Sequence, residues 1–98
     1  MREFSIITVV FNAVADLEKT IKSILGQRFP DREYIIIDGG STDGTVDIIR
    51  RYEKQLAFWS SEPDRGIYDA MNKGVLKARG NFLNFMNAGD LFADENVP

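Results

Sequence analysis

The sequence predicts an α/β fold, a Rossmann-like three-layer αβα arrangement around a mostly parallel sheet. Apolar, β-branched runs alternate along the chain with segments in which apolar residues recur at helical spacing. The two strongest runs are too continuous for strands with one face in water, so they suit strands covered on both faces. Strands that alternate with helices form βαβ units and hence parallel sheets. The chain has 98 residues, which suits one small domain.

Four apolar runs are predicted to be strands. Residues 4–11, with the sequence FSIITVVF, and residues 34–38, with the sequence YIIID, are the two nearly continuous runs. Residues 56–61 (LAFWSS) and 81–86 (NFLNFM) are expected to form the third and fourth strands. The chain has no internal repeat, linker or low-complexity segment.

Three segments, residues 15–27, 45–55 and 67–78, are predicted to be helices because apolar residues recur on one face of each. Asp16 is expected at the N-cap or in the first turn of the first helix, and Gly26 at its end. Residues 93–98 are expected to open a fourth helix. The residues expected to face inward are Leu17, Ile21, Ile24, Leu25, Val46, Ile49, Tyr52, Ile67, Ala70, Met71, Gly74, Val75 and Ala78.

The composition excludes several classes of site and partner. The chain has no cysteine and no histidine, so a disulfide framework, a thiolate metal site and a histidine base are excluded, and any metal must be held by oxygen atoms, as Mg, Mn or Ca are. The net charge of -3 and the absence of a basic run argue against nucleic-acid binding. The longest apolar run is too short to span a bilayer and resembles no secretory signal, so we expect a cytoplasmic protein, with peripheral membrane attachment left open.

Polar residues follow each predicted strand. Asn12 follows the first strand, residues 38–43 the second and residues 87–90 the fourth, while residues 62–69 lead from the third strand into a helix. Ligands of parallel α/β sheets bind outside the carboxyl ends of the strands. These residues are therefore the candidates for a binding site.

The turn at residues 38–45, DGGSTDGT, is the densest of these clusters. Its glycines permit unusual backbone conformations, and residues 41–43 are good capping types for the next helix. Capping does not explain Asp38, because a carboxylate buried after YIII needs a hydrogen-bond partner, and a ligand N–H group would supply one. A phosphate-binding P-loop is excluded because Thr45 stands where its lysine should be, and Gly40 breaks the ligand series of an EF-hand.

Two further residues each allow two interpretations from the local sequence alone. Arg65 precedes a predicted helix, where it would add a bidentate anion partner to the free N–H groups of the helix end. The alternative, that Glu62 and Asp64 favour the helix dipole and Arg65 is an ordinary surface residue, has equal weight. Asp90 by itself is better interpreted as a helix cap, although it could also reach a phosphate through a divalent cation.

In this order, the stretches SIITVVFN, IDGGSTDGT and SEPDRGIYDAMNKGVLKARGNFLNFMNAGD resemble the N-terminal half of a family 2 glycosyltransferase with the GT-A fold. The sequence is most similar to the bacterial branch that builds cell-surface polysaccharides, such as colanic-acid-like enzymes. The resemblance covers almost the whole chain. It implies that residues 1–98 are the nucleotide-sugar-binding half of a glycosyltransferase domain, truncated at the C-terminus.

The resemblance also assigns roles to individual residues. In the family pattern the last acid of a D-x-D-type motif ligates the metal on the sugar-nucleotide diphosphate, and Asp90 matches that acid. Asn87 and Gly89 replace acids that are common in the wider family, so we expect weakly bound Mn or Mg when the nucleotide is absent. The expected nucleotide-binding residues are Phe11 and Asn12 beside the base and ribose, Asp38 on the nucleobase, and Arg65 and Asp69 along the groove, with Asn72 supporting it.

The function implied is inverting transfer of a sugar from a nucleoside-diphosphate sugar, such as a UDP-sugar, to a growing polysaccharide or a lipid-linked acceptor. The catalytic base is expected beyond residue 98, so we expect no transfer by the chain alone. An alternative is a non-catalytic α/β module that binds nucleotide or self-associates into a homo-oligomer through an exposed sheet edge. A receiver-like signalling domain is disfavoured because VVFNA lacks the acids that such a domain needs.

Overall fold

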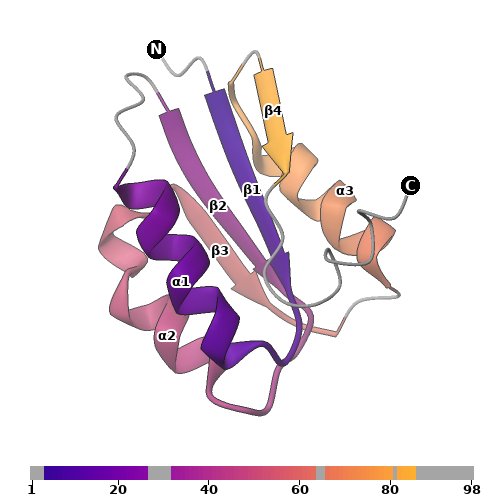
Figure 1. Ribbon diagram of the computed structural model, residues 1–98. Helices are drawn as coiled ribbons and strands as arrows, with labels where there is room; N and C mark the ends of the chain where they lie inside the picture. The colour runs from indigo at the N-terminus through magenta and orange to yellow at the C-terminus, as the bar shows by residue number, and fades with distance from the viewer. Residues whose placement is uncertain (1–3, 27–31, 64–65, 81, 86–98) are drawn as a thin grey trace, which may run out of the picture.

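A sheet of four strands in the order β3-β2-β1-β4 lies at the centre of the computed structural model, which describes residues 4–26, 32–63, 66–80 and 82–85 (Figure 1). Every pair of neighbouring strands is parallel, which confirms the predicted fold class. The strands are β1 (Phe4–Val10), β2 (Arg32–Asp38), β3 (Phe58–Ser61) and β4 (Phe82–Phe85). The helical segments are α1 (Val14–Leu25), α2 (Thr45–Arg51), α3 (Ile67–Lys77) and a short 3-10 helix, η1 (Glu53–Gln55).

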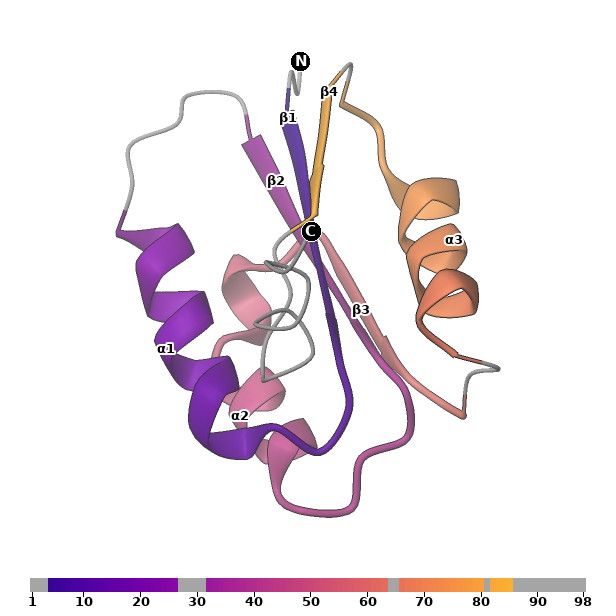
Figure 2. The same ribbon diagram turned by 45° about the vertical axis from the view of Figure 1, so that its right-hand side comes forward.

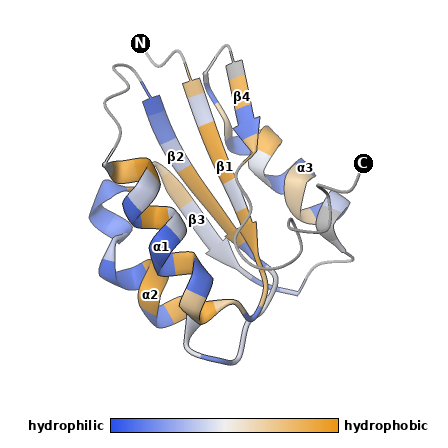
Figure 3. Cartoon of the chain, in the orientation of Figure 1, coloured by the Kyte–Doolittle hydropathy of each residue, from blue (hydrophilic) through white to orange (hydrophobic). Residues whose placement is uncertain are grey.

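Helices cover both faces of the sheet, with α1 and α2 on one face and α3 on the other (Figure 2). The two central strands, β1 and β2, are consequently buried on both faces from their second residue to their last. Their interiors are the most continuous hydrophobic segments of the molecule (Figure 3). This three-layer arrangement explains why the two apolar runs of the sequence do not alternate with polar residues.

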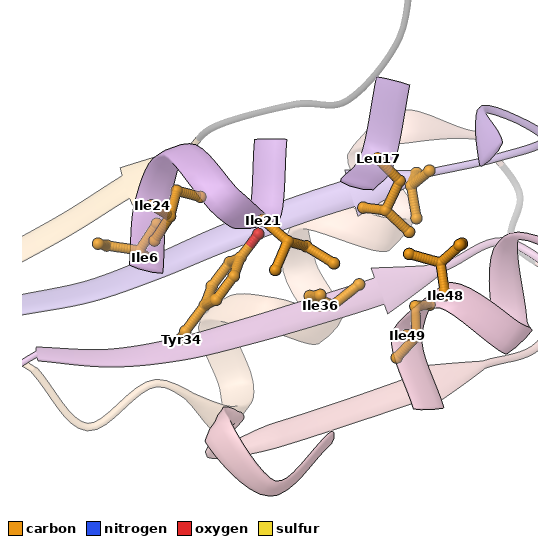
Figure 4. Close-up of a cluster of buried hydrophobic side chains, with 9 residues drawn as sticks. Ile6, Leu17, Ile21, Ile24, Tyr34, Ile36, Ile48 and Ile49 are labelled. Carbon is orange, nitrogen blue, oxygen red and sulfur yellow. The ribbon is translucent and has the colours of Figure 1, made fainter. Parts of the chain in front are cut away.

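The larger hydrophobic core lies between the sheet and the helices α1 and α2 (Figure 4). Within it, the Tyr34 hydroxyl lies 2.9 Å from the hydroxyl oxygen of Thr8, so both buried polar groups have a partner. The buried members of this core are Ile6, Val10, Leu17, Ile21, Ile24, Tyr34, Ile36, Ile48 and Ile49. The smaller core beneath α3 consists of Ile7, Val9, Ile35, Ile37 and Ala70.

Helix α3 packs very close to β1, and a glycine makes this possible. Gly74 is buried, and a Cβ atom on it would lie 2.5 Å from Cγ2 of Ile7. The predicted contact stripe along this helix is confirmed at Ala70 and Gly74 but is wrong at Val75, which is 41% exposed. Close packing through two small residues leaves the neighbouring larger side chain outside the contact.

Several element boundaries differ from the predicted ones because tertiary contacts decide them. Strand β2 begins two residues early, because Arg32 and Glu33 pair with the first residues of β1. The buried Glu33 carboxylate accepts a hydrogen bond of 2.7 Å from the Ser5 hydroxyl. The second helix ends at Arg51 and is followed by the separate turn η1, while β3 begins at residue 58 instead of 56. The helix expected at residues 93–98 lies outside the described residues.

Burial of Tyr34 makes the stability of the fold sensitive to alkaline pH. Burial raises the pKa of this phenol from 10.0 to about 12, and its contact with Thr8 offsets only part of that rise. The unfolded chain therefore releases this proton before the folded chain does. The stabilisation is fully present below pH 10.0 and is lost as pH rises toward 12.

We expect the free energy of unfolding to fall by roughly 3 kcal/mol between these two pH values because of Tyr34. Urea unfolding at a series of alkaline pH values, for the wild type and for Tyr34→Phe, measures this contribution as the difference in slope. The Phe variant also loses the contact with Thr8, which shifts its curve but adds no slope. Parallel curves for the two proteins would contradict the assignment.

Candidate functional site

The carboxyl ends of β1, β2 and β3 lie level with one another, which brings the following loops together. Val10 is paired in register with Asp38, and Asp38 is paired with Ser61. Two backbone bonds continue these ladders: the N–H of Gly39 donates to the Val10 carbonyl at 2.9 Å, and the N–H of Glu62 donates to the Asp38 carbonyl at 3.0 Å. The loops after the three strands therefore begin at one edge of the sheet (Figure 1).

Asp38 is the central side chain of this edge, and it is completely buried. Its Oδ2 accepts hydrogen bonds from the backbone N–H groups of Gly40 and Ser41, at 3.1 and 2.8 Å, and from the Ser61 hydroxyl at 2.7 Å. Its Oδ1 accepts a bond of 2.5 Å from the Ser41 hydroxyl. The expected need for a hydrogen-bond partner is met within the protein, because the turn and β3 supply four donors, so no ligand N–H group is required. That Asp38 contacts a nucleobase stays a prediction.

Asn12 joins the loop after β1 to the loop after β2. Its backbone N–H donates to the Ser41 hydroxyl oxygen at 2.7 Å, and its side-chain Oδ1 accepts from the N–H of Thr42 at 2.8 Å. Asn12 has a φ of 47°, a left-handed conformation that asparagine tolerates better than most residues. These two bonds hold it there, with Phe11 beside it 62% exposed.

The start of helix α1 is capped by residues of the neighbouring loop. Ala13, at the N-cap position, offers no side-chain oxygen, and the N–H of Val14 donates instead to Asp43 Oδ2 at 3.3 Å. The N–H of Ala13 donates to the hydroxyl oxygen of the buried Thr45 at 3.3 Å. The Thr45 hydroxyl in turn donates to Asp43 Oδ1 at 2.5 Å. The prediction that residues 41–43 cap the following helix is wrong in position, because the N-cap of α2 is Gly44. Asp43 still accepts from the N–H of Thr45 at 3.1 Å, and it serves α1 as well.

The hydrogen bonds to Asp43 set its acidity. The Thr45 hydroxyl is the largest cause that holds the pKa of the Asp43 carboxyl below its ordinary value of 3.8, and the N–H groups of Thr45 and Val14 add to it. These contacts favour the charged form, which also suits the positive ends of the two helix dipoles. The stabilisation is present above the ordinary pKa and is lost as pH falls through the lowered value.

Asp69 lies in the first turn of α3 and is connected to the end of β3 through a lysine. Lys73 Nζ lies 3.8 Å from an Asp69 carboxylate oxygen and 3.8 Å from a Glu62 carboxylate oxygen. Glu62 directly follows β3, so these charges lie at the same edge of the sheet as Asp38. Asn72 on α3 is exposed, and its expected support of the groove stays a prediction.

Two of the predicted site residues, Arg65 and Asp90, lie outside the described residues, as do Asn87 and Gly89. In the described part of the chain, no group of three or more acidic side chains could hold a metal ion. The described residues could therefore bind a metal ion only together with ligands from other residues or from a bound nucleotide. Within the same ranges, no helix is both long enough and apolar enough to cross a membrane. The expected cytoplasmic location stays a prediction.

Sequence reasoning missed the two serines that satisfy Asp38 and the threonine that caps α1. Ser41 and Thr45 belong to a stretch, residues 41–45, that helix capping explained adequately, and Ser61 is the last residue of a short strand with no evident role. A usable signal existed in hindsight, because a buried acid at one strand end calls for donors at the ends of the adjacent strands. Recognising it requires the strand order, which the sequence pattern does not reveal.

The parallel α/β fold is of the GT-A glycosyltransferase type, as comparison with solved structures shows. A mannosyltransferase from Pyrobaculum calidifontis, solved with GDP-Man and Mn²⁺, superposes with a TM-score of 0.80 at 26% identity, over 89% of this chain and 28% of that one. Staphylococcus aureus TarS in complex with UDP superposes with a TM-score of 0.76 at 26% identity, over 88% of this chain and 27% of that one. Residues 5–98 match the family described as Glycosyl transferase family 2, and the chain belongs to that family.

Relatives in sequence carry glycosyltransferase names. An uncharacterized glycosyltransferase of Mycobacterium tuberculosis is 45% identical over 95% of this chain and 36% of its own length. A PGL/p-HBAD biosynthesis glycosyltransferase of Mycobacterium bovis is 41% identical over 89% of this chain and 35% of its own. TuaG of Bacillus subtilis, named for teichuronic acid biosynthesis, is 38% identical over 95% of this chain and 38% of its own. The chain thus spans little more than a third of these relatives. The colanic-acid-like assignment stays a prediction.

Replacing Thr45 by valine tests the shared cap. The substitution keeps the shape of the side chain but removes the hydroxyl that serves both Ala13 and Asp43. We expect it to lower the free energy of unfolding by about 1–3 kcal/mol, because a part-buried N–H group loses its acceptor. Urea denaturation measures the change.

The matched control is Thr42→Val in the same loop, where the side chain is exposed. We expect this control to change stability by no more than about 0.5 kcal/mol. Equal losses in the two variants would show that the Thr45 hydroxyl has no special part in joining the loops.

Proposed function

We propose that this protein provides the donor-nucleotide site of a family 2 glycosyltransferase and binds a nucleoside-diphosphate sugar, of which a UDP-sugar is the first candidate. The observation that carries the proposal is the joining of three loops at the carboxyl edge of the sheet, where ligands of such sheets bind. The UDP complex of TarS and the GDP-Man complex of the mannosyltransferase support a nucleotide ligand for this fold.

Phe11 and Asn12 are the residues proposed to border the base and the ribose. The exposed Phe11 ring offers a surface on which a base can stack, an interaction that tolerates different bases because each has a π-face. The Asn12 amide oxygen is engaged by Thr42, so a contact with a ribose hydroxyl would come from the Nδ2 group. Asp69 and Arg65 are proposed to line the path of the diphosphate and the sugar.

A divalent cation, Mn or Mg, is proposed as the cofactor, and Asp90 as its protein ligand. Bound to the diphosphate, such an ion supplies charge neutralisation for a departing nucleoside diphosphate. The oxygen-only chemistry of this chain suits these hard cations, since it has neither histidine nor cysteine. The Mn²⁺ present in the related mannosyltransferase complex supports the assignment.

For the whole protein we propose inverting transfer to a saccharide or lipid-linked acceptor. An acceptor hydroxyl oxygen forms a bond to the anomeric carbon while the bond from that carbon to the diphosphate oxygen breaks. The nucleoside diphosphate leaves with the electron pair, and the hydroxyl proton passes to a carboxylate base beyond residue 98. The biosynthetic names of the relatives support a cell-envelope polymer or glycolipid as the acceptor. Residues 1–98 are proposed to form the nucleotide-sugar-binding half of this domain.

Calorimetric titration with UDP in the presence of MnCl₂ tests the proposed base platform. We expect Phe11→Ala to weaken binding roughly 5- to 150-fold, the range that corresponds to an aromatic contact worth ~1–3 kcal/mol. Phe11→Tyr should bind like the wild type, because it keeps the ring. Phe11→Leu should resemble the alanine variant, because it keeps apolar volume without a ring. The wild type is titrated with GDP as well, and failure to bind both UDP and GDP would overturn the proposed function.

Repeating the titration with and without MnCl₂ tests the proposed metal ligand. We expect Mn²⁺ to strengthen UDP binding by the wild type and to have no more than a small effect on Asp90→Ala, because the protein side of the metal bridge is removed. Asp94→Ala removes an acid four positions further on and serves as the matched control, with the metal effect retained. A full metal effect in Asp90→Ala would exclude this residue as the ligand.

A further inference from the structure

We propose that Asp38 is a positioning residue of the donor site, which holds the loops that receive the nucleotide and does not itself contact the nucleobase. The inference deepens the proposed function and rests on it. It departs from the family-based expectation for this residue, and the reason is the environment of the carboxylate. Asp38 has no exposed surface, so a base could reach it only after the turn had moved.

The acceptor capacity of Oδ2 is already used. Oδ2 receives three donors, from Gly40, Ser41 and Ser61, within 3.1 Å. A carboxylate oxygen has about two lone-pair directions, so a further N–H donor would have to displace one of these three. Each of the three comes from the folded chain itself. At Oδ2, a nucleobase would therefore have to exchange an internal bond for an external one. Oδ1 accepts one hydrogen bond, from the Ser41 hydroxyl, and the complete burial of the side chain keeps a ligand from its remaining lone pair.

The Ser41 hydroxyl connects the buried Asp38 carboxylate to the exposed residue Asn12 through two hydrogen bonds. Its single proton is donated to Asp38 Oδ1, so its lone pairs face the N–H of Asn12, which donates to it at 2.7 Å. The side-chain Oδ1 of Asn12 in turn accepts a hydrogen bond of 2.8 Å from the backbone N–H of Thr42, in the same loop as Ser41. The carboxylate thus orients a hydroxyl, and the hydroxyl fixes a residue 29 positions away in the sequence.

The held residue needs this support because its backbone is in an uncommon conformation. Asn12 has a φ of 47°, which persists where surrounding contacts determine it. Phe11, the proposed base platform, precedes it directly. The backbone N–H of Gly40, which has a φ of 90°, donates to the same Asp38 carboxylate. The conformation of both loops therefore depends on one buried acid.

The Ser61 hydroxyl offers the mildest way to test this proposal. Ser61→Ala removes one of the four donors to Asp38 and leaves the carboxylate in place, so the chain is expected to fold. Ser61→Thr restores a hydroxyl in a residue type that suits a strand. Asp38→Asn and Ser41→Ala perturb the network more strongly, and Asp47→Asn, an exposed acid on α2, is the matched control.

Binding of UDP and of GDP is measured by calorimetry with MnCl₂, at a temperature where circular dichroism shows each variant fully folded. If a variant holds the loops correctly in roughly a tenth of its molecules, its Kd rises about tenfold for either nucleotide, because the dissociation constant scales inversely with the competent fraction. We expect Ser61→Ala, Ser41→Ala and Asp38→Asn to lose affinity for UDP and GDP by the same factor within each variant. Ser61→Thr and Asp47→Asn should match the wild type.

A second measurement tests the hydrogen-bonded connection from Asp38 through Ser41 to Asn12 in the absence of nucleotide. In ¹⁵N correlation spectra we expect Asp38→Asn and Ser61→Ala to shift the amide resonance of Asn12, and Asp47→Asn to leave it unchanged.

A change in the UDP-to-GDP affinity ratio in Asp38→Asn would overturn the proposal in favour of direct base contact. Unchanged affinities in Ser61→Ala and Ser41→Ala would overturn it as well. Absence of nucleotide binding by the wild type would instead overturn the proposed function.

Discussion

The burial of one carboxylate at the carboxyl edge of the sheet is the constraint on which the organisation of this site depends. An acid removed from water must find donors within the protein, because a buried polar group without partners costs several kcal/mol. Asp38 finds them in the turn that follows its own strand and in the last residue of the adjacent strand. Meeting that requirement aligns the end of β3 with the end of β2 and gives the glycine-rich turn one defined shape.

The fold was predictable to the extent that it follows from periodicity. Continuous β-branched runs indicated buried parallel strands, and the helical spacing indicated the helices that cover them. The failures occur where a neighbour outside the local window decides the outcome. Strand β2 begins early because β1 offers a partner for Glu33, and Val75 is exposed because Gly74 lets the helix settle on Ile7. Neither neighbour is visible in a short stretch of sequence.

The site was predictable in its location and only partly in its contacts. The rule that ligands bind at the carboxyl ends of parallel strands led to Asn12, Asp38 and Asp69. The structure places them at that edge, on the loop after β1, at the end of β2 and in the first turn of α3. The rule did not reveal that Asp38 faces inward. A sequence shows that an acid follows an apolar run but not whether its side chain turns toward a ligand or toward serines contributed by other loops. In our proposal, that distinction makes Asp38 a residue that supports the loops instead of one that contacts the ligand.

The cap shared by α1 and the neighbouring loop has a consequence for the exchange of segments between related proteins. Asp43 and Thr45 belong to one βα loop and complete the start of a helix that belongs to another. A transplanted loop that lacks either oxygen would leave the host helix with open N–H groups, even if the transplant were well formed in itself. The two loops are therefore coupled. A sequence change in one loop keeps the start of α1 capped only if the other loop changes to match.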